Sequence, residues 1–427
     1  MKWLLKHKAG ALQLTTYIII VIALLLTGFI LLIHTHKQFV LQSDTIIHTI
    51  KSTDEGIRYA LNQTILPRDT FNLKSTEIPN SKLKLHKDNW GVFEKVKSIS
   101  SIRNKTFQKV ALLGSTSNST NRSVLYLEDN SKPLVVVGNT KINGLAYLPK
   151  PGVKAGSIAG HSYYGSQLIY GSTKVSKNLP AISKSILNEI QSLINVLSHL
   201  TEDQFLSIKE GVKFSNSFKN ALQIIYSDQT INLNDIELTG HIIVQSKTKI
   251  VVDASSQLKD VLLVASEVEI KPNVVGSFQA IATKAVSVAK NVQLNYPSAL
   301  VLHKKPDSKQ AVAINPYEER DKITIEENTT IKGAIVFLGE DILNNYNSQI
   351  ELKENSKVYG ELYCNQNIDL KGKVFGTVYT HNFIAKQSGS VYQNHIYNGV
   401  IDIDALPEQY SGLLFNDSKK VVAKWLY

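Results

Sequence analysis

The feature that most limits the fold of this 427-residue chain is a repeat of apolar residues. Successive segments begin at Ile250, Val268 and Val286, a spacing of 18 residues. In the full repeat, apolar residues follow the first one at offsets of 2, 8, 12 and 13, and glycine can stand at offset 10. The full form starts at Leu134, Ile250, Ile323 and Ile350, and a form two residues shorter starts at Val268, Val286 and Ile368. Apolar pairs two residues apart are typical of short strands that turn alternate side chains inward. The repeat therefore predicts a mainly β fold, in which parallel strands stack as a β-helix or a related solenoid.

The glycines at offset 10 are Gly144, Gly333 and Gly360, and we expect each to make a tight corner with positive φ. The repeat also divides the chain. We expect a small mixed α/β region over 67–133, the solenoid over 134–410, and a cap over 411–427 that covers the last coil. Phe383, Val391 and Ile396 are expected to continue the coils near their end.

Two insertions interrupt the predicted solenoid. The first, over 180–210, has apolar residues at helical spacing, and Thr201 with Gln204 then forms a capping box that predicts a second helix. Such a helical hairpin would cover one end or an edge of the solenoid. The second insertion, over 304–322, is expected to be a polar loop.

A 23-residue stretch without charged side chains, residues 11–33, lies near the N-terminus. As a helix it would be about 34 Å long, enough to cross a hydrocarbon core of about 30 Å. Lys2, Lys6 and Lys8 precede it, and Lys37 is the only lysine or arginine in the next dozen residues. The positive-inside rule then predicts a single pass through the cytoplasmic (inner) membrane, with the N-terminus inside and the rest exported.

Apolar residues continue at helical spacing as far as Ile65, and the first proline is Pro67. We therefore expect one membrane-spanning and extended helix over 11–66. A cleaved secretory signal peptide is the competing interpretation, although the apolar run is longer than the usual signal. An uncleaved signal anchor is a further alternative.

Two blocks of this region resemble the N-terminal region of PilX-type minor pilins. The first is Lys-Ala-Gly-Ala-Leu-Gln-Leu at 8–14, and the second is Asp-Glu-Gly-Ile-Arg-Tyr-Ala-Leu at 54–61. The second block contains the family-like residues Asp54, Glu55, Gly56, Tyr59, Ala60 and Leu61. The resemblance implies a prepilin whose basic leader, 1–10, is removed between Gly10 and Ala11, and whose helix assembles with other pilin helices. Thr15 stands at the fifth mature position, where many pilins carry glutamate. PilX-type members tolerate this difference, which favours a minor or tip subunit.

After residue 134 the repeat resembles the short-coil β-helix of bactofilins, the polymer-forming proteins. Similar modules form the exported part of some PilX-type proteins, so the two resemblances are consistent. The resemblance to bactofilins is the less specific of the two, because alternation of isoleucine and valine is common to β-solenoids.

No residue pattern indicates catalysis, a cofactor or a metal site. His34 and His36 are two apart, so on a helix they point away from each other. The single cysteine, Cys364, can form neither an intrachain disulfide nor a cysteine zinc site, and we expect it to be buried. Asp402 and Asp404 share one strand face, as acids do in solenoid glycosidases, but without a visible third partner two solvated carboxylates are the favoured interpretation.

The charge pattern is equally unspecific. Lys and Arg number 47 against 36 Asp and Glu, and this excess of +11 is spread along the chain without a nucleic-acid motif. We expect solvated solenoid faces and no nucleic-acid partner. The glycine- and tyrosine-rich stretch 156–171 is expected to form turns at coil corners, with an aromatic platform for sugars as the alternative.

Together these features predict a non-enzymatic, single-pass bacterial envelope protein. Its helix would join a type IV pilus-like assembly, with membrane lipid and other pilin-like subunits as partners, and its solenoid would lie outside the membrane, at or near a pilus tip. The alternative is an anchored bactofilin-like scaffold, or a protein that binds cell-wall or surface polysaccharide independently of pili. A polysaccharide-active enzyme is a third interpretation.

Overall fold

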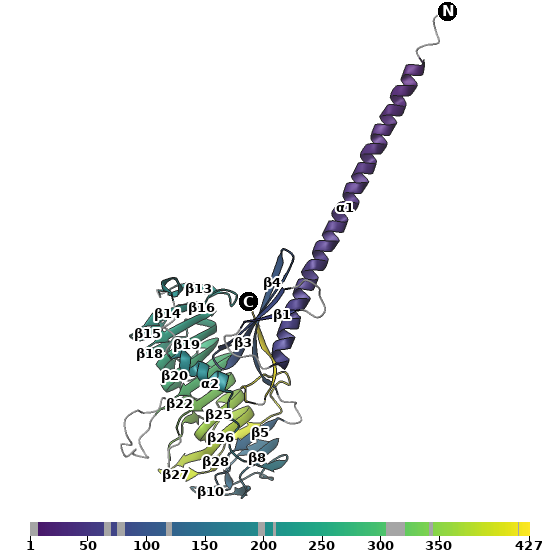
Figure 1. Cartoon of the computed structure of the whole chain (residues 1–427). Helices are drawn as coiled ribbons and strands as arrows, with labels where there is room; N and C mark the ends of the chain where they lie inside the picture. The colour runs from purple at the N-terminus through teal and green to yellow at the C-terminus, as the bar shows by residue number, and fades with distance from the viewer. Residues whose placement is uncertain are drawn as a thin grey trace, which may run out of the picture. The chain divides into compact units, whose positions relative to one another are not determined.

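The computed structural model describes residues 7–63, 70–74, 82–116, 122–194, 201–207, 211–304, 321–340, 345–416 and 418–427 (Figure 1). Two compact units are distinguished. The first comprises Met1–Gly56, Phe71–Leu85 and Ser98–Gln108, and the second comprises Ile57–Thr70, His86–Lys97 and Lys109–Tyr427. The loop predicted over 304–322 lies outside the described residues except at its two ends.

The N-terminal element is one unbroken helix, α1 (His7–Asn62), of 56 residues. This confirms the long N-terminal helix predicted over 11–66, although the described helix ends at Asn62. No proline occurs before Pro67, whose ring and missing N–H are incompatible with a helix interior. The long apolar run therefore continues as a helix without a break (Figure 1).

A small antiparallel sheet occupies the region where the sequence predicts a mixed α/β connection. Its strands are β1 (Thr70–Lys74), β2 (Lys82–Trp90), β3 (Phe93–Ile102), β4 (Lys105–Thr116) and β30 (Lys419–Leu426), in the order β1-β2-β3-β4-β30. The described part of 67–133 is thus made of strands, and the expected helical component is wrong for these residues.

The C-terminal segment does not cap the last coil. Instead β30 pairs antiparallel with β4, with Val422 opposite Leu113 and Leu426 opposite Val110. Adding a strand to a sheet gives the backbone N–H and C=O groups of the segment their partners, which an irregular cap would not do as fully. The cap predicted over 411–427 is therefore wrong in its location.

Short strands of the larger unit stack into a solenoid, which confirms the predicted fold class. Before the helical insertion the strands are β5 (Ser123–Leu127), β6 (Leu134–Val137), β7 (Lys141–Asn143), β8 (Leu145–Leu148), β9 (Val153–Ala155) and β12 (Thr173–Val175), with the antiparallel pair β10 (Ser157–Ile158) and β11 (His161–Ser162). After it come β13 (Lys213–Asn216), β14 (Gln223–Ser227), β15 (Ile231–Leu233), β16 (Glu237–Gly240), β17 (Ile242–Ser246), β18 (Lys249–Val252), β19 (Gln257–Ile270), β20 (Val275–Val288), β21 (Gln293–His303), β22 (Lys322–Ile325), β23 (Thr330–Leu338), β24 (Ile350–Leu352), β25 (Lys357–Leu370), β26 (Lys373–Gln387), β27 (Ser390–Gln393), β28 (His395–Tyr397) and β29 (Val400–Asp402).

Parallel ladders join these strands in three rows. The long strand β19 belongs to all three, because its first part pairs with β16, its middle with β17 and its last part with β18. Register shifts within β19, near Asp260 and Ser266, separate the three parts. We name these rows one, two and three in this order. Each coil contributes one short strand to each row.

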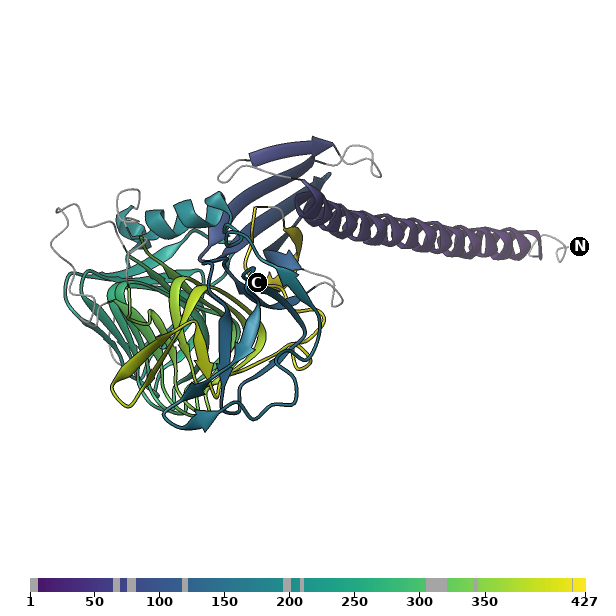
Figure 2. The same ribbon diagram turned by 90° about the horizontal axis from the view of Figure 1, so that it is seen from below.

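The coils do not stack in the order of the chain. In row two Leu125 of β5 lies opposite Val378 of β26, and in row one Ile142 of β7 lies opposite Ile401 of β29. One coil is therefore completed by β29 from the C-terminal part and β5 from the N-terminal part. Figures 1 and 2 show these blue and yellow strands side by side. The segment 123–175 extends the stack beyond β29, and the solenoid begins at Ser123 rather than at residue 134.

The predicted repeat positions at offsets 0, 2 and 8 lie in the solenoid interior. Leu134, Val136 and Ile142 are buried in the same apolar cluster as Ile250, Ile323 and Ile350. Of the two consecutive apolar residues at offsets 12 and 13, one packs in the solenoid interior and the other packs in an outer apolar layer. Leu262, Val336 and Tyr363 pack outward, whereas their chain neighbours Leu263, Ile335 and Leu362 pack inward. Row two is thus buried on both faces, and such strands read as continuous apolar runs.

The predicted corner glycines have positive φ, at +132° for Gly144, +144° for Gly333 and +146° for Gly360. A Cβ on Gly360 would lie 1.9 Å from the carbonyl oxygen of Gly333 on the next coil. Both the backbone conformation and the close approach of the coils therefore require glycine.

The helical insertion contains α2 (Lys184–Leu193), whose residues Ile186 and Ile190 pack on the outer side of row two. The predicted second helix is a single 3-10 turn, η3 (Glu202–Gln204), after which Phe205 is extended and bridges Ile224. The capping box at Thr201 and Gln204 is present, but the described residues form a turn rather than a helix. The described helix α2 covers the outer face of row two, which is a flank of the solenoid.

The C-terminal part of the solenoid contains one local exception to the repeat. Phe383 and Ile396 are buried in the interior as expected, but Val391 is exposed in β27, which pairs antiparallel with β26. The prediction that Val391 continues a coil is wrong, because the chain turns back there as a hairpin.

Candidate functional site

The two halves of α1 differ in their surroundings. From Leu12 to Leu41 the large apolar side chains are exposed, and the most apolar stretch of the helix has no buried residues. The helix is long and apolar enough to cross a membrane. From Thr49 onward one side of α1 is buried instead. A large exposed apolar surface of this kind indicates a contact with lipid or with other helices.

The residues at the predicted cleavage position lie within α1. Gly10 is exposed, and a Cβ built on it would have nothing within 4 Å. The hydroxyl of Thr15 donates to the carbonyl oxygens of Ala11, at 3.1 Å, and Leu12, at 2.9 Å. Thr15 thus satisfies its hydroxyl within the helix, and it offers no charge to neutralise an amino terminus.

The family-like block marks the place where α1 becomes buried. Ser52, Gly56 and Ala60 are four residues apart and buried, and they form a stripe of small side chains on one face of the helix. A Cβ on Gly56 would lie 2.3 Å from the hydroxyl oxygen of Ser98 and 3.2 Å from methyl carbons of Leu83 and Leu85. Gly56 therefore allows the helix backbone to approach β2 and β3 closely.

The other residues of the block lie nearer the surface. Asp54, Glu55 and Leu61 are partly buried, and Tyr59 is 40% exposed. The buried members of the block, Gly56 and Ala60, thus serve helix packing.

The carboxylates of Asp402 and Asp404 are brought together by β7. One amide group, Nδ2 of Asn143, donates to Asp402 at 2.9 Å and to Asp404 at 2.8 Å, and Lys141 lies 3.2 Å from Asp402. Burial alone would raise the pKa of Asp402, but hydrogen bonds from Asp404 N–H, Asn143 and Lys141 lower it below its usual value. The sequence missed these partners because β7 lies some 260 residues away in the chain. An acid with a lowered pKa is poorly suited to donate a proton.

The described residues hold no group of three or more His, Cys, Asp or Glu side chains that could bind a metal ion. Cys364 is buried, as the sequence predicts, and burial raises the pKa of its thiol. These observations assign no catalytic or metal-binding role to Cys364, Asp402 or Asp404.

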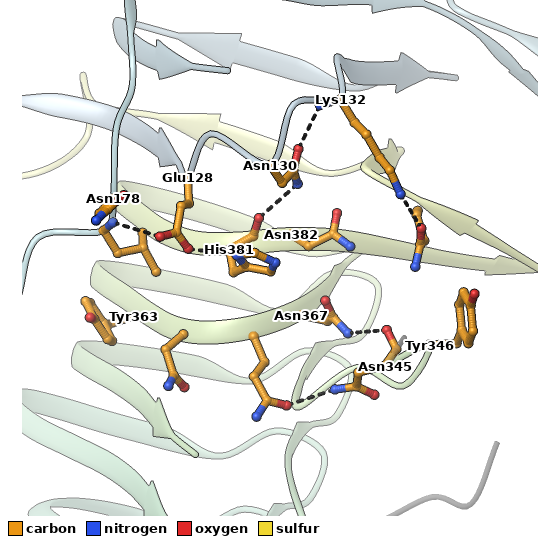
Figure 3. Close-up of a pocket in the computed structure, with 14 residues that line it drawn as sticks. Glu128, Asn130, Lys132, Asn178, Asn345, Tyr346, Tyr363, Asn367, His381 and Asn382 are labelled. Atoms are coloured by element: carbon orange, nitrogen blue, oxygen red, sulfur yellow. Dashed lines mark hydrogen bonds and ion pairs between the residues drawn. The ribbon is translucent and has the colours of Figure 1, made fainter. Parts of the chain in front are cut away.

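A polar cleft of about 680 Å³ lies at the corner between rows two and three, where the two chain segments of the composite coil meet (Figure 3). We call it the amide cleft, because eight of its fourteen lining residues are asparagine or glutamine. Its lining residues are Glu128, Asn130, Lys132, Asn178, Leu179, Asn345, Tyr346, Tyr363, Asn365, Gln366, Asn367, His381, Asn382 and Gln393.

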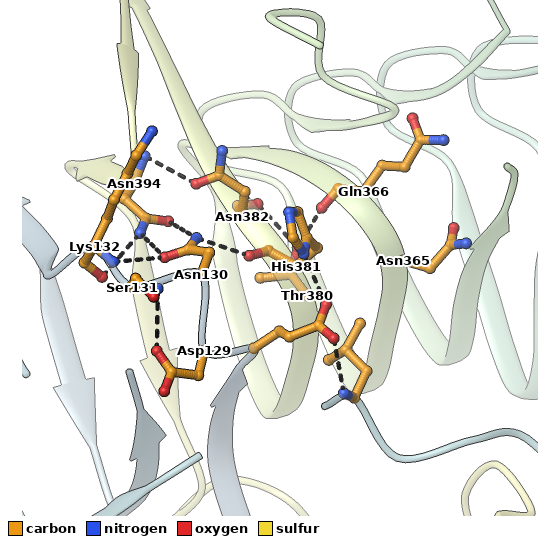
Figure 4. A network of polar contacts seen from close by, with 12 residues as sticks. Asp129, Asn130, Ser131, Lys132, Asn365, Gln366, Thr380, His381, Asn382 and Asn394 are labelled. Atoms are coloured by element: carbon orange, nitrogen blue, oxygen red, sulfur yellow. Dashed lines mark hydrogen bonds and ion pairs between the residues drawn. The ribbon is translucent and has the colours of Figure 1, made fainter. Parts of the chain in front are cut away.

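One wall of the cleft is fixed by the junction between the N-terminal and C-terminal coils (Figure 4). Asn130 and Asn394 exchange side-chain hydrogen bonds of 3.1 and 2.9 Å. Asn394 is 1% exposed, and it also donates through its backbone N–H to the side-chain oxygen of Asn382 at 3.0 Å. Fully bonded amides of this kind hold the wall in one geometry.

The opposite wall is fixed by the corner of β25. Asn365 exchanges two hydrogen bonds with the backbone of Gly339, and Asn367 donates to the carbonyl oxygens of Asn345 and Asn347 at 3.0 and 2.8 Å. The amides of β25 therefore position the segment that carries Tyr346.

The charged groups of the cleft make hydrogen bonds within the protein. Glu128 accepts from Nδ1 of His381 at 2.7 Å and from Leu179 N–H at 3.4 Å. The hydrogen bond from His381 lowers the pKa of Glu128 more than burial raises it. Lys132 donates to the side-chain oxygen of Gln393 at 3.0 Å. None of the cleft residues could be identified from the sequence, because six separate segments supply them and no short motif joins them.

Comparison with known proteins gives little further information. No family model and no curated protein matches the chain. Among solved structures, the competence-associated pilin ComZ from Thermus thermophilus is similar at 10% sequence identity and a TM-score of 0.19, over 90% of this chain and 98% of that one. So low a TM-score does not indicate a shared fold.

Proposed function

We propose that this chain is a membrane-anchored, pilin-like subunit that carries a β-solenoid outside the cytoplasmic membrane. In the finer form of the proposal it is a PilX-type minor pilin with a bactofilin-like exported part. It acts by assembly and not by catalysis, with membrane lipid and other pilin-like subunits as its partners.

The observation that carries the proposal is the change of surroundings along α1. A single helix is exposed and apolar in its first half and packed through small residues in its second half. Exposed apolar side chains must be covered by lipid or by other apolar helices. The first half is thus suited to insertion and lateral assembly, while the second half is fixed to the folded part of its own unit.

The basic leader and the residues around Gly10 support a prepilin. A protease that cleaves a chain must admit its backbone closely, and Gly10 presents no side chain at the position before the cut. Thr15, which bonds to its own helix, favours a subunit at the tip rather than in the repeating body.

Processing of the leader tests the proposal. In cells that contain a prepilin peptidase, intact-mass analysis of the purified chain should give an N-terminus at Ala11. Gly10→Val should block the cut, since a β-branched side chain would then enter the cleft of the protease. Gly28→Val is the matched control, because Gly28 is also a helical glycine at which an added Cβ would have nothing within 4 Å. The control should be processed normally.

An N-terminus at Met1 in both wild type and the peptidase deletion would remove the prepilin part of the proposal. It would favour the alternative, an anchored scaffold or polysaccharide-binding protein independent of pili. A photo-crosslinker at the exposed Leu24 separates the two further. Cross-links to other pilin-like subunits support assembly, and cross-links to lipid alone contradict it.

A further inference from the structure

The amide cleft contains polar groups that the protein itself does not use. Among the described residues, no hydrogen bond is made by the Tyr363 hydroxyl, by Nδ2 of Asn382, or by the side chain of Asn178. Tyr363 is 6% exposed, and burial raises the pKa of its hydroxyl to about 12. It therefore stays a neutral group that can donate and accept at physiological pH.

The walls that hold these groups are rigid, as the bonded amides of β25 and the Asn130–Asn394 pair show. An unbonded N–H or O–H donor in a fixed wall can form a hydrogen bond with a ligand oxygen, and this bond contributes to the binding free energy. Amide groups supply both donors and acceptors, which suits hydroxyl groups because each hydroxyl can also do both.

The charged groups of the cleft do not favour strongly anionic ligands. Glu128 is paired with His381, and Lys132 is engaged with Gln393. One carboxylate and one ammonium group balance, so no cluster of cations is available for phosphate or for nucleic acid. The favoured ligand is uncharged and rich in hydroxyl groups.

The shape of the surface indicates a chain rather than a single small molecule. A second hollow of about 320 Å³, lined by residues 386–391 with Tyr346 and Asn347, adjoins the cleft. Tyr346 lines both hollows and thus stands between them. An aromatic ring that lines both hollows provides an apolar face against which the C–H face of a sugar ring can pack.

We infer that the amide cleft binds a neutral oligosaccharide, which hydrogen-bonds to Asn178, Tyr363 and Asn382 and crosses Tyr346 into the second hollow. The volume of the cleft lies in the range of roughly 300–1,000 Å³ that is usual for ligand sites. This inference does not depend on whether α1 assembles with pilins.

Binding of defined glycans to the full chain in detergent micelles tests the inference. The probes are the neutral tetramers of glucose, mannose and N-acetylglucosamine, with tetragalacturonate and a glycerol-phosphate tetramer as anionic comparisons. At least one neutral probe should bind with Kd below about 1 mM. Its affinity should change less than about twofold between about 0.05 and 0.5 M salt, because no ion pair is formed.

Two variants locate the site. Asn178→Ala and Tyr346→Ala should each weaken binding about fivefold, as expected for loss of one hydrogen bond or one ring contact. Asn178 is exposed and unbonded, so its replacement leaves the fold intact even if Tyr346→Ala disturbs the neighbouring loop. The matched controls are Gln293→Ala, an exposed amide of row one, and Tyr164→Ala, an exposed tyrosine of the stretch 156–171.

The controls should bind as the wild type does. Three results would overturn the inference: no neutral probe is bound, only the anionic probes are bound, or Asn178→Ala and Tyr346→Ala both bind with unchanged affinity. If Tyr164→Ala alone weakens binding, the sugar site lies in the stretch 156–171 and the amide cleft is not the site.

Discussion

Glu361 is a buried carboxyl group whose ionisation should control how firmly the C-terminal segment is held. Its side chain lies in row two and accepts a hydrogen bond of 2.6 Å from the backbone N–H of Leu413. Arg122 provides a weaker attraction, and it donates to the carbonyl oxygen of Tyr410 at 3.2 Å. Burial outweighs the hydrogen bond from Leu413 and raises the pKa of Glu361 from 4.5 to about 7.

The sign of the effect follows from the raised pKa. Between pH 4.5 and about 7 the folded segment binds a proton that the unfolded segment has lost, so stability falls as the pH rises through this window. At about 1.4 kcal/mol for each pH unit, the loss is on the order of 3 kcal/mol. Glu361→Gln removes the ionisation but keeps an oxygen that can accept from Leu413. We expect this variant to lack most of the pH dependence and to hold the segment more firmly than wild type at pH 8.

Hydrogen exchange of the peptide that contains Leu413, corrected for intrinsic rates at each pH, measures the free energy of opening. Glu354→Gln is the matched control, because Glu354 is exposed in the turn before the same strand. Wild type and the control should both lose stability between pH 5 and 8. Equal slopes in wild type and Glu361→Gln would refute the reasoning.

Three further changes test the packing. Ile335→Ala empties a fully buried interior position and should lower the free energy of unfolding by about 3 kcal/mol in urea titrations, and an unchanged free energy would contradict the assigned core. Gly56→Val would place a Cβ 2.3 Å from the Ser98 hydroxyl oxygen and should lower the free energy of unfolding by about 1–3 kcal/mol, so that proteolysis becomes faster. Gly28→Val should leave the rate of proteolysis unchanged, because its Cβ would have nothing within 4 Å. Asn394→Ala breaks the junction of the composite coil and should cost about 1–3 kcal/mol, and proteolysis as slow as in wild type would argue against that role.

Much of the solenoid could be predicted because its repeat is local. The alternation at Ile250 and Val252 specifies strands with one inward face, and the glycine at 360 specifies a corner with positive φ. The position of a coil in the stack could not be predicted in this way. The segment that starts at Leu134 has the same pattern as the one at Ile350, so the pattern does not say which coil it adjoins.

The candidate site depends on that undetermined order. Asn130 faces Asn394 only because β5 docks on β26, some 250 residues later in the chain. The outer layer over row two could not be identified from the sequence either. Consecutive apolar residues, such as Leu262 and Leu263, show that two faces are buried but not what covers the second face.

The sequence by itself determined the elements whose causes are local: an uninterrupted apolar helix, short strands with inward-facing residues, and glycine at tight corners. The tertiary structure alone decided which coil lies beside which, where the C-terminal strand pairs, and how the amide cleft is assembled. The physical reason is that every coil offers the same backbone hydrogen bonds to its neighbours. The choice among them is made by side chains that meet only after folding, such as Asn130 with Asn394 and Glu361 with the N–H of Leu413.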